Sequence, residues 1–136
     1  MTARSTRIEL TDWFDSRAVA LRAAMDAETG AMYAAFVDGL STTERAALDD
    51  ALSIDPAEIT HTLIAFDGDV SIGHAATRPF ADSLEVKKVF VSEAARGRAV
   101  ARLLMAELES IARARGAASL VLQTGPLQVA AIGLYL

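Results

Sequence analysis

The chain has 136 residues, 52% of them hydrophobic and 23% charged, which is the composition of one ordinary globular domain with a single core. Its net charge of −5 argues against non-specific nucleic-acid binding, which requires a broad basic surface. Because the chain has no cysteine, disulfides, thiolate metal sites and an acyl-cysteine intermediate are excluded.

The first half of the chain predicts a strand followed by helices. Residues 6–12 are typical of a short strand, and the alanine-rich stretch 16–35 predicts one or two helices. Ser41 and Glu44 form a Ser-x-x-Glu capping box, so a further helix is expected to begin there. The Asp-Pro step at 55–56 ends that helix.

Three strands are predicted next. The apolar-rich runs 59–66 and 70–77 flank the sequence Asp-Gly-Asp at 67–69, which is a hairpin signal, so these two strands should be antiparallel. After a loop around residues 79–82, a third strand is expected at 84–91.

The apolar alternation changes phase inside this third strand. Leu84 and Val86 are apolar at even positions, whereas Val89 and Val91 are apolar at odd ones, with two lysines between them. A β-bulge explains such a change, and bulges are common beside active sites. The alternative is that Lys88 is an exposed end of an edge strand.

The last third of the chain predicts a helix, a strand and a final helix. The helix at 98–115 has an apolar face, and Gly116 ends it. Residues 119–122 form a short buried strand, and Pro126 begins the last helix. The predicted fold class is therefore α/β with a mixed sheet, in the order β-α-α-β-β-β-α-β-α.

Neither end of the sequence predicts a membrane segment. Residues 1–10 contain no apolar run of signal-peptide length, so a cytoplasmic location is expected. The uncharged run 116–136 carries glutamines and Pro126 in its middle, where a membrane span would place polar groups at the bilayer centre.

The junction between the strand at 84–91 and the helix at 98–115 is the expected binding site for an anion. Amides at a helix start lack internal partners and lie at the positive end of the macrodipole. Residues 87–102 include five basic residues and one acid, a local charge of +4, and subtracting it from −5 leaves −9 for the rest of the chain. Small and basic residues alternate here: Arg96, Gly97, Arg98, Ala99, Val100, Ala101 and Arg102.

This junction resembles the signature of the GCN5-related N-acetyltransferase (GNAT) family, Val-x-x-x-x-Arg/Gln-x-x-Gly-x-Gly/Ala. Val91, Arg96, Ala99 and Ala101 match it in order, except that Ala99 replaces the first glycine. Alanine is a mild replacement where the backbone is helical and a worse one where φ is positive. The resemblance implies that residues 96–102 bind the pyrophosphate of acetyl-CoA through backbone amides.

The resemblance also implies site residues on the preceding strand. Backbone groups around Val89, Phe90 and Val91 are expected to contact the thioester carbonyl and the pantetheine arm. Glu85 lies six residues before Val91, at the family's position for a general base, and would work there only if burial raises its pKa. A solvated carboxylate is the alternative for Glu85. His74 is a second candidate base, although a lone histidine on a strand is more often structural.

Two further residues belong to the last helix of the resembling family. Tyr135, in Ala-x-x-Leu-Tyr, would protonate the coenzyme A thiolate, unless it is an ordinary core residue. Gln128 stands roughly where the family has an asparagine, so the resemblance implies a cofactor contact there.

The resemblance covers residues 67–136 and implies an acyl-CoA N-acyltransferase fold. Direct transfer of an acetyl group to a primary amine of a small molecule or peptide follows, and a noncatalytic acetyl-CoA-binding module is the alternative. Family members continue with two more strands, so the single domain at 1–136 is expected to be truncated. The strand at 119–122 would then expose an edge that invites a homodimer. The sequence predicts no metal, nucleic-acid or membrane partner.

Overall fold

The computed structural model of the chain describes residues 6–39, 41–44 and 54–122. Their centre is a five-stranded sheet whose spatial order equals the chain order. Neighbouring strands are antiparallel except the last pair, in which β5 runs parallel to β4. The strands are β1 (Thr6–Thr11), β2 (His61–Asp67), β3 (Val70–Phe80), β4 (Ser83–Val91) and β5 (Leu120–Leu122).

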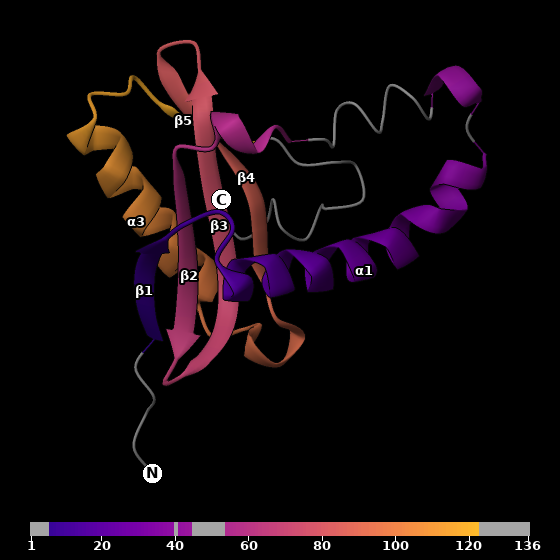
Figure 1. The fold of residues 1–136 in the computed structure, drawn as a ribbon, viewed down its shortest axis with the longest axis horizontal. Helices are drawn as coiled ribbons and strands as arrows, with labels where there is room; N and C mark the ends of the chain where they lie inside the picture. The colour runs from indigo at the N-terminus through magenta and orange to yellow at the C-terminus, as the bar shows by residue number, and fades with distance from the viewer. Residues whose placement is uncertain (1–5, 40, 45–53, 123–136) are drawn as a thin grey trace.

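Two helices lie against this sheet (Figure 1). Helix α1 (Ser16–Asp38) follows β1, and its second half projects beyond the strands. Helix α3 (Val100–Ala114) connects β4 to β5, as a parallel pair requires. Two short 3₁₀ turns are also present: η1 (Pro56–Glu58) before β2 and η2 (Glu93–Ala95) after β4.

Strand β2, which lies between β1 and β3, is buried on both faces. Alternate side chains of a strand point to opposite faces, so Ile64 packs against Ala18 on the α1 side, whereas Leu63 packs on the α3 side. Residues 62–67 are therefore all buried, although their side chains point alternately to the two faces of the sheet. The two helices therefore cover opposite faces of the sheet.

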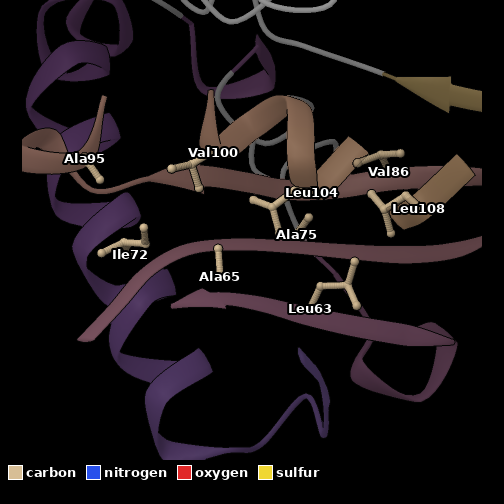
Figure 2. Packing of buried hydrophobic residues seen from close by; sticks show 9 residues of the cluster. All are labelled: Leu63, Ala65, Ile72, Ala75, Val86, Ala95, Val100, Leu104 and Leu108. Atoms are coloured by element: carbon tan, nitrogen blue, oxygen red, sulfur yellow. The ribbon is translucent and has the colours of Figure 1, made fainter. Parts of the chain in front are cut away.

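The larger core lies between α3 and the sheet. Figure 2 shows Leu104 and Leu108 of α3 facing Ala75 and Val86 of the sheet. Both leucines are 0% exposed, and burial of each contributes about 2 kcal/mol. Helix α3 lies so close to β3 that a Cβ added at Gly73 would meet the Cγ1 atom of Val100 at 3.0 Å.

Most of the predicted elements are confirmed. The first strand, the hairpin of β2 and β3 and a single long α1 all form. Ser41 and Glu44 make both hydrogen bonds of the capping box, at 3.0 and 3.1 Å, and residues 42–44 are helical. Helix α3 ends in a Schellman motif, in which Gly116 has φ +71° and the amide of Ala117 donates to the carbonyl of Ala112 at 2.9 Å.

The loop predicted at 79–82 is wrong in its extent. Strand β3 continues to Phe80, and only Ala81 and Asp82 connect it to β4. Ala81 supplies the positive φ, +54°, that this tight hairpin uses. As a result Arg78 belongs to the strand and pairs with Glu85.

The last predicted helix, which begins at Pro126, lies outside the described residues. In the described part of the chain, no helix is both long enough and apolar enough to cross a membrane.

Candidate functional site

Strand β4 carries the bulge that the phase change predicts. Its pairing with β3 slips by one residue after Lys87, so Lys88 and Val89 together lie opposite Ala75. Lys88 takes the left-handed conformation, with φ +55°. Because of the extra residue, Val89 packs on the same core beneath α3 as Val86. The reading of Lys88 as the plain end of an edge strand is wrong.

The carbonyl of the bulge is held by a buried histidine. His74 Nδ1 lies 2.8 Å from the carbonyl oxygen of Lys88, and Arg22 Nη1 lies 2.9 Å from His74 Nε2. A carbonyl only accepts and a guanidinium only donates, so the ring carries its proton on Nδ1 and is neutral. Burial, together with the cationic Arg22 and Lys88, lowers the pKa of His74 to about 4. Both ring nitrogens are engaged, which leaves His74 no role as a free base.

Beyond the bulge, β4 presents backbone groups to the side away from β3. The amide of Ser92 donates to the carbonyl of Ile72 on β3 at 2.8 Å. Because successive residues of a strand direct their backbone groups to opposite edges, those of Val91 face the edge on which β5 lies. The described pairing of β4 with β5 covers only Leu84 to Val86. The amide of Val91 is therefore directed to this edge, whereas its carbonyl accepts from Nε of Arg96 at 3.1 Å. A contact of this amide with the pantetheine arm stays a prediction.

The link from β4 to α3 passes through two residues with positive φ. Gly97 has φ +83° and Ala99 has φ +61°. A helix cannot include these conformations, so α3 begins at Val100 and the predicted start at residue 98 is wrong. A Cβ added at Gly97 would meet nothing within 4 Å. At position 99 alanine is therefore the worse replacement for the glycine of the family signature, because the backbone has a positive φ. An alanine in this left-handed region costs about 1 kcal/mol.

The first turn of α3 is left uncapped by the chain. Its N-cap, Ala99, makes no side-chain hydrogen bond, and the first turn contains no acidic residue. The helix ladder begins with the amide of Leu103, which donates to the carbonyl of Ala99 at 3.2 Å. Within the described residues, the amides of residues 100–102 thus lack an intrahelical acceptor and a side-chain cap. Together with the open backbone at Gly97, this donor set fits a diphosphate.

The three arginines of the loop and the first turn of α3 have different surroundings. Arg96 donates from Nε to the carbonyl of Val91 at 3.1 Å and pairs through Nη2 with Glu28 of α1. Arg98 Nη2 lies 3.1 Å from Asp67 Oδ2. Arg102 is exposed on α3. Two of the three cations expected around the anion are therefore already paired with carboxylates.

Glu85 is buried rather than solvated, so the reading of a solvated carboxylate is wrong. Its side chain is 1% exposed. Arg78 Nε donates to Oε1 at 2.6 Å, and Lys87 Nζ lies 3.7 Å from the same oxygen. Oε2 is buried and has no hydrogen-bond partner among the described residues, and the same holds for Oγ1 of Thr62. The carboxylate is thus balanced by two cations and keeps one oxygen for a donor.

Sequence reasoning missed Arg22 and Arg78. Arg78 continues the alternation of His74 and Ala76 along β3, a signal that the expected loop at 79–82 obscured. Arg22 gives no local signal, because its partner lies 52 residues away. Tyr135 and Gln128 lie outside the described residues, so their roles stay predictions.

Comparisons with known proteins identify the fold and the family of the chain. A segment of 51 residues is 45% identical to an IAA acetyltransferase from Azospirillum brasilense and spans 38% of this chain and 33% of that protein. The chain thus covers about a third of the length of that relative. The crystal structure of a presumed acyl-CoA N-acyltransferase from Klebsiella pneumoniae is similar over 96% of this chain and 79% of that one, with 26% identity and a TM-score of 0.69.

An aminoglycoside acetyltransferase from an uncultured soil metagenomic sample is similar over 96% of this chain and 88% of that one. Its identity of 21% and TM-score of 0.64 show a common fold alone. The family model described as Acetyltransferase (GNAT) family matches residues 20–136, which include the bulge, the loop and α3. This chain, with the mixed α/β fold of acyl-CoA N-acyltransferases, belongs to the GNAT acetyltransferase family.

Proposed function

We propose that the chain transfers an acetyl group from acetyl-CoA directly to a primary amine of a small molecule or peptide. The observation that carries the proposal is the uncapped first turn of α3 next to the open backbone of Gly97. Such a turn offers several amide donors and a positive dipole end to one diphosphate. When bound, acetyl-CoA would supply the activated acetyl thioester.

The chain's own backbone would hold the two ends of this cofactor. Amides of residues 100–102 and the loop at 96–99 would bind the pyrophosphate, and Arg102 would add positive charge. The edge of β4 at residues 89–91 would bind the pantetheine arm and orient the thioester carbonyl. Hydrogen bonds to that carbonyl make its carbon more electrophilic, which is what attack by an amine requires.

Glu85 would act on the acceptor amine. An ammonium group must lose a proton before its nitrogen can attack, and Oε2 of Glu85 is the oxygen with capacity to accept that proton. As the bond from nitrogen to the acetyl carbon forms and the bond from carbon to sulfur breaks, the thiolate needs a proton. The hydroxyl of Tyr135 is the proposed donor on the basis of the family resemblance.

A noncatalytic acetyl-CoA-binding module is the second candidate. It is favoured by the ion pair of Glu85 with Arg78, whose 2.6 Å contact withdraws one carboxylate oxygen from any proton transfer. This candidate shares the cofactor site with the first one and differs only in turnover.

Calorimetric titration of acetyl-CoA into the chain tests the cofactor site. The parent should bind, and Gly97→Glu should bind at least tenfold more weakly, because it adds a negative charge next to the pyrophosphate. Gly97→Gln is the matched control, with the same backbone penalty at φ +83° and no charge. Gly68→Glu, at the hairpin turn with φ +61°, should bind as the parent does. Equal binding by all four would refute the site.

Release of free thiol from acetyl-CoA in the presence of amines separates the two candidates. The acceptor panel would contain an aminoglycoside, a short peptide with a free N-terminus and a simple alkylamine. Turnover above the amine-free background with any of them supports the enzyme, and Glu85→Gln should then lose most of it while binding acetyl-CoA as before. Binding without turnover across the panel would favour the module.

A further inference from the structure

His74 connects α1, β3 and the bulge of β4 through one buried ring. Its Nδ1 donates to the carbonyl of Lys88, and its Nε2 accepts from Arg22. Arg22 is itself fixed, since its guanidinium lies 3.5 Å from the ring centroid of Trp13 and donates to the carbonyl of that residue at 2.5 Å. Trp13 also packs edge-on against His74, with ring centroids 6.0 Å apart. The orientation of the imidazole is thus fixed on two sides.

The bulge depends on this ring for its buried polar contact. Lys88 has φ +55°, which lysine rarely adopts, so another interaction must hold the bulge in place. The Lys88 side chain contributes little, because its Nζ lies 3.6 Å from Asp26, whose side chain is 68% exposed. The hydrogen bond from His74, which is 0% exposed, is the buried contact at this point.

We propose that His74 is a positioning residue, which holds the Lys88 carbonyl and so directs the backbone of residues 89–91 toward the thioester end of acetyl-CoA. The inference rests on the proposed function, because it concerns the same cofactor. His74 does not touch the reacting atoms in this role. It acts through Lys88 in the bulge. Lys88 lies two residues before Phe90, where regular pairing with β3 resumes.

The two ends of the cofactor site allow this role to be tested. The pyrophosphate end would be formed by the loop at 96–99 and the start of α3. The two hydrogen bonds of the His74 ring join it instead to Arg22 and to the carbonyl of Lys88. The thioester end is built from the backbone that follows the bulge. A change at His74 should therefore weaken the binding of acetyl-CoA. It should leave unchanged the binding of 3′-phosphoadenosine 5′-diphosphate, which lacks the pantetheine arm.

Three variants isolate the hydrogen bond from the packing. His74→Phe keeps a ring against Trp13 and loses both hydrogen bonds. His74→Asn keeps an amide donor near the position of Nδ1, and His74→Gln moves the amide to the position of Nε2. Each would be titrated with both ligands by calorimetry, and its unfolding temperature would be recorded alongside.

The ratio of the two dissociation constants is the decisive quantity. In His74→Phe, the binding of acetyl-CoA should be weakened about tenfold relative to that of the nucleotide, because one oriented hydrogen bond is lost. In His74→Asn, the ratio of the two dissociation constants should be about that of the parent. Equal weakening of both ligands in His74→Phe would assign His74 to the core and overturn the proposal. If His74→Phe does not fold, a tenfold difference in the ratio between the Gln and Asn variants supports the proposal and equal ratios overturn it.

Failure of the proposed function gives a separate result. A parent chain that binds neither ligand would refute the cofactor site itself. A parent that binds the nucleotide and acetyl-CoA, with ratios unchanged in all three variants, would refute only the role of His74.

Discussion

Arg78 and Glu85 face each other across β3 and β4, and Nε of the arginine lies 2.6 Å from Oε1 of the glutamate. The same guanidinium lies 3.6 Å from Glu58, whose side chain is 56% exposed, whereas that of Glu85 is 1% exposed. One arginine therefore meets a buried and a solvated carboxylate. Loss of Arg78 would leave the buried Glu85 with Lys87 as its one cation among the described residues, whereas the solvated pair contributes little.

Replacement of Arg78 by methionine should destabilise the fold by about 3 kcal/mol, because it leaves Glu85 with Lys87 alone at 3.7 Å. Urea unfolding at pH 7 measures the loss. Glu58→Ala, which removes the exposed partner of the same arginine, should cost less than about 0.5 kcal/mol. The double variant Arg78→Met with Glu85→Gln should recover part of the stability. A double variant as unstable as Arg78→Met would contradict the view that the loss comes from an undercompensated buried charge.

The stability of the fold should fall between pH 6.5 and pH 4 through His74. Its folded-state pKa of about 4 lies below the ordinary value of 6.5, so in this range the unfolded chain binds a proton that the folded chain does not. The free energy of unfolding is therefore greatest above pH 6.5 and decreases as the pH falls, by about 2 kcal/mol at pH 5. The charged groups nearby are Arg22, Lys88 and its partner Asp26.

Urea midpoints at pH 7 and pH 5 would measure this difference. His74→Asn should show a smaller loss on acidification than the parent, since it has no group to titrate at this position. His61, whose pKa is also lowered by burial, remains in both proteins and so does not affect the comparison. The same pH dependence in parent and variant would show that other groups carry it.

Substitution of Ala99 by glycine should stabilise the fold by up to about 1 kcal/mol, because it relieves the positive φ of +61°. Thermal unfolding would detect a rise of a few degrees. Ala106→Gly, at an exposed position inside α3, should lower stability by about 1 kcal/mol. Destabilisation by both substitutions would mean that the loop prefers alanine for a reason other than its backbone conformation.

Neutralisation of Glu28 should strengthen nucleotide binding. Arg96 is now paired with this carboxylate, and Glu28→Gln would release the guanidinium and remove a negative charge near the loop. We expect the dissociation constant for 3′-phosphoadenosine 5′-diphosphate to fall about threefold at low salt, an effect that 0.5 M salt would reduce. Glu109→Gln breaks a similar exposed pair with Arg113 far along α3 and should change nothing. Weaker binding by Glu28→Gln would show instead that Glu28 orients Arg96.

The fold could be predicted in most of its order because each element carries a local signal. The phase change at Val86 and Val89 located the bulge, and Gly116 located the end of α3. One error arose where tertiary pairing decided the outcome, and another where a single residue took an uncommon backbone conformation. Strand β3 runs through the expected loop because Arg78 and Pro79 pair with β4, and α3 starts late because Ala99 is left-handed.

The candidate site was predictable only in its backbone part. Small and basic residues at 96–102 mark a loop and a helix start, and these features depend on neighbours in sequence. The ion pair of Glu85 with Arg78 and the contacts of His74 join residues from different elements. Local sequence patterns do not predict which side chains from distant segments are in contact. The partners of Glu85 could therefore not be predicted from the sequence.

The single parallel pair of the sheet has a consequence for the order of folding. Strands β2, β3 and β4 are joined by hairpins of two residues each, so their contacts are local and can form early. Strand β5 reaches β4 only after the chain has completed α3, and loop closure of that length is slow. The turn that would hold the cofactor lies within this crossover, so it should be among the last parts to acquire protection from hydrogen exchange.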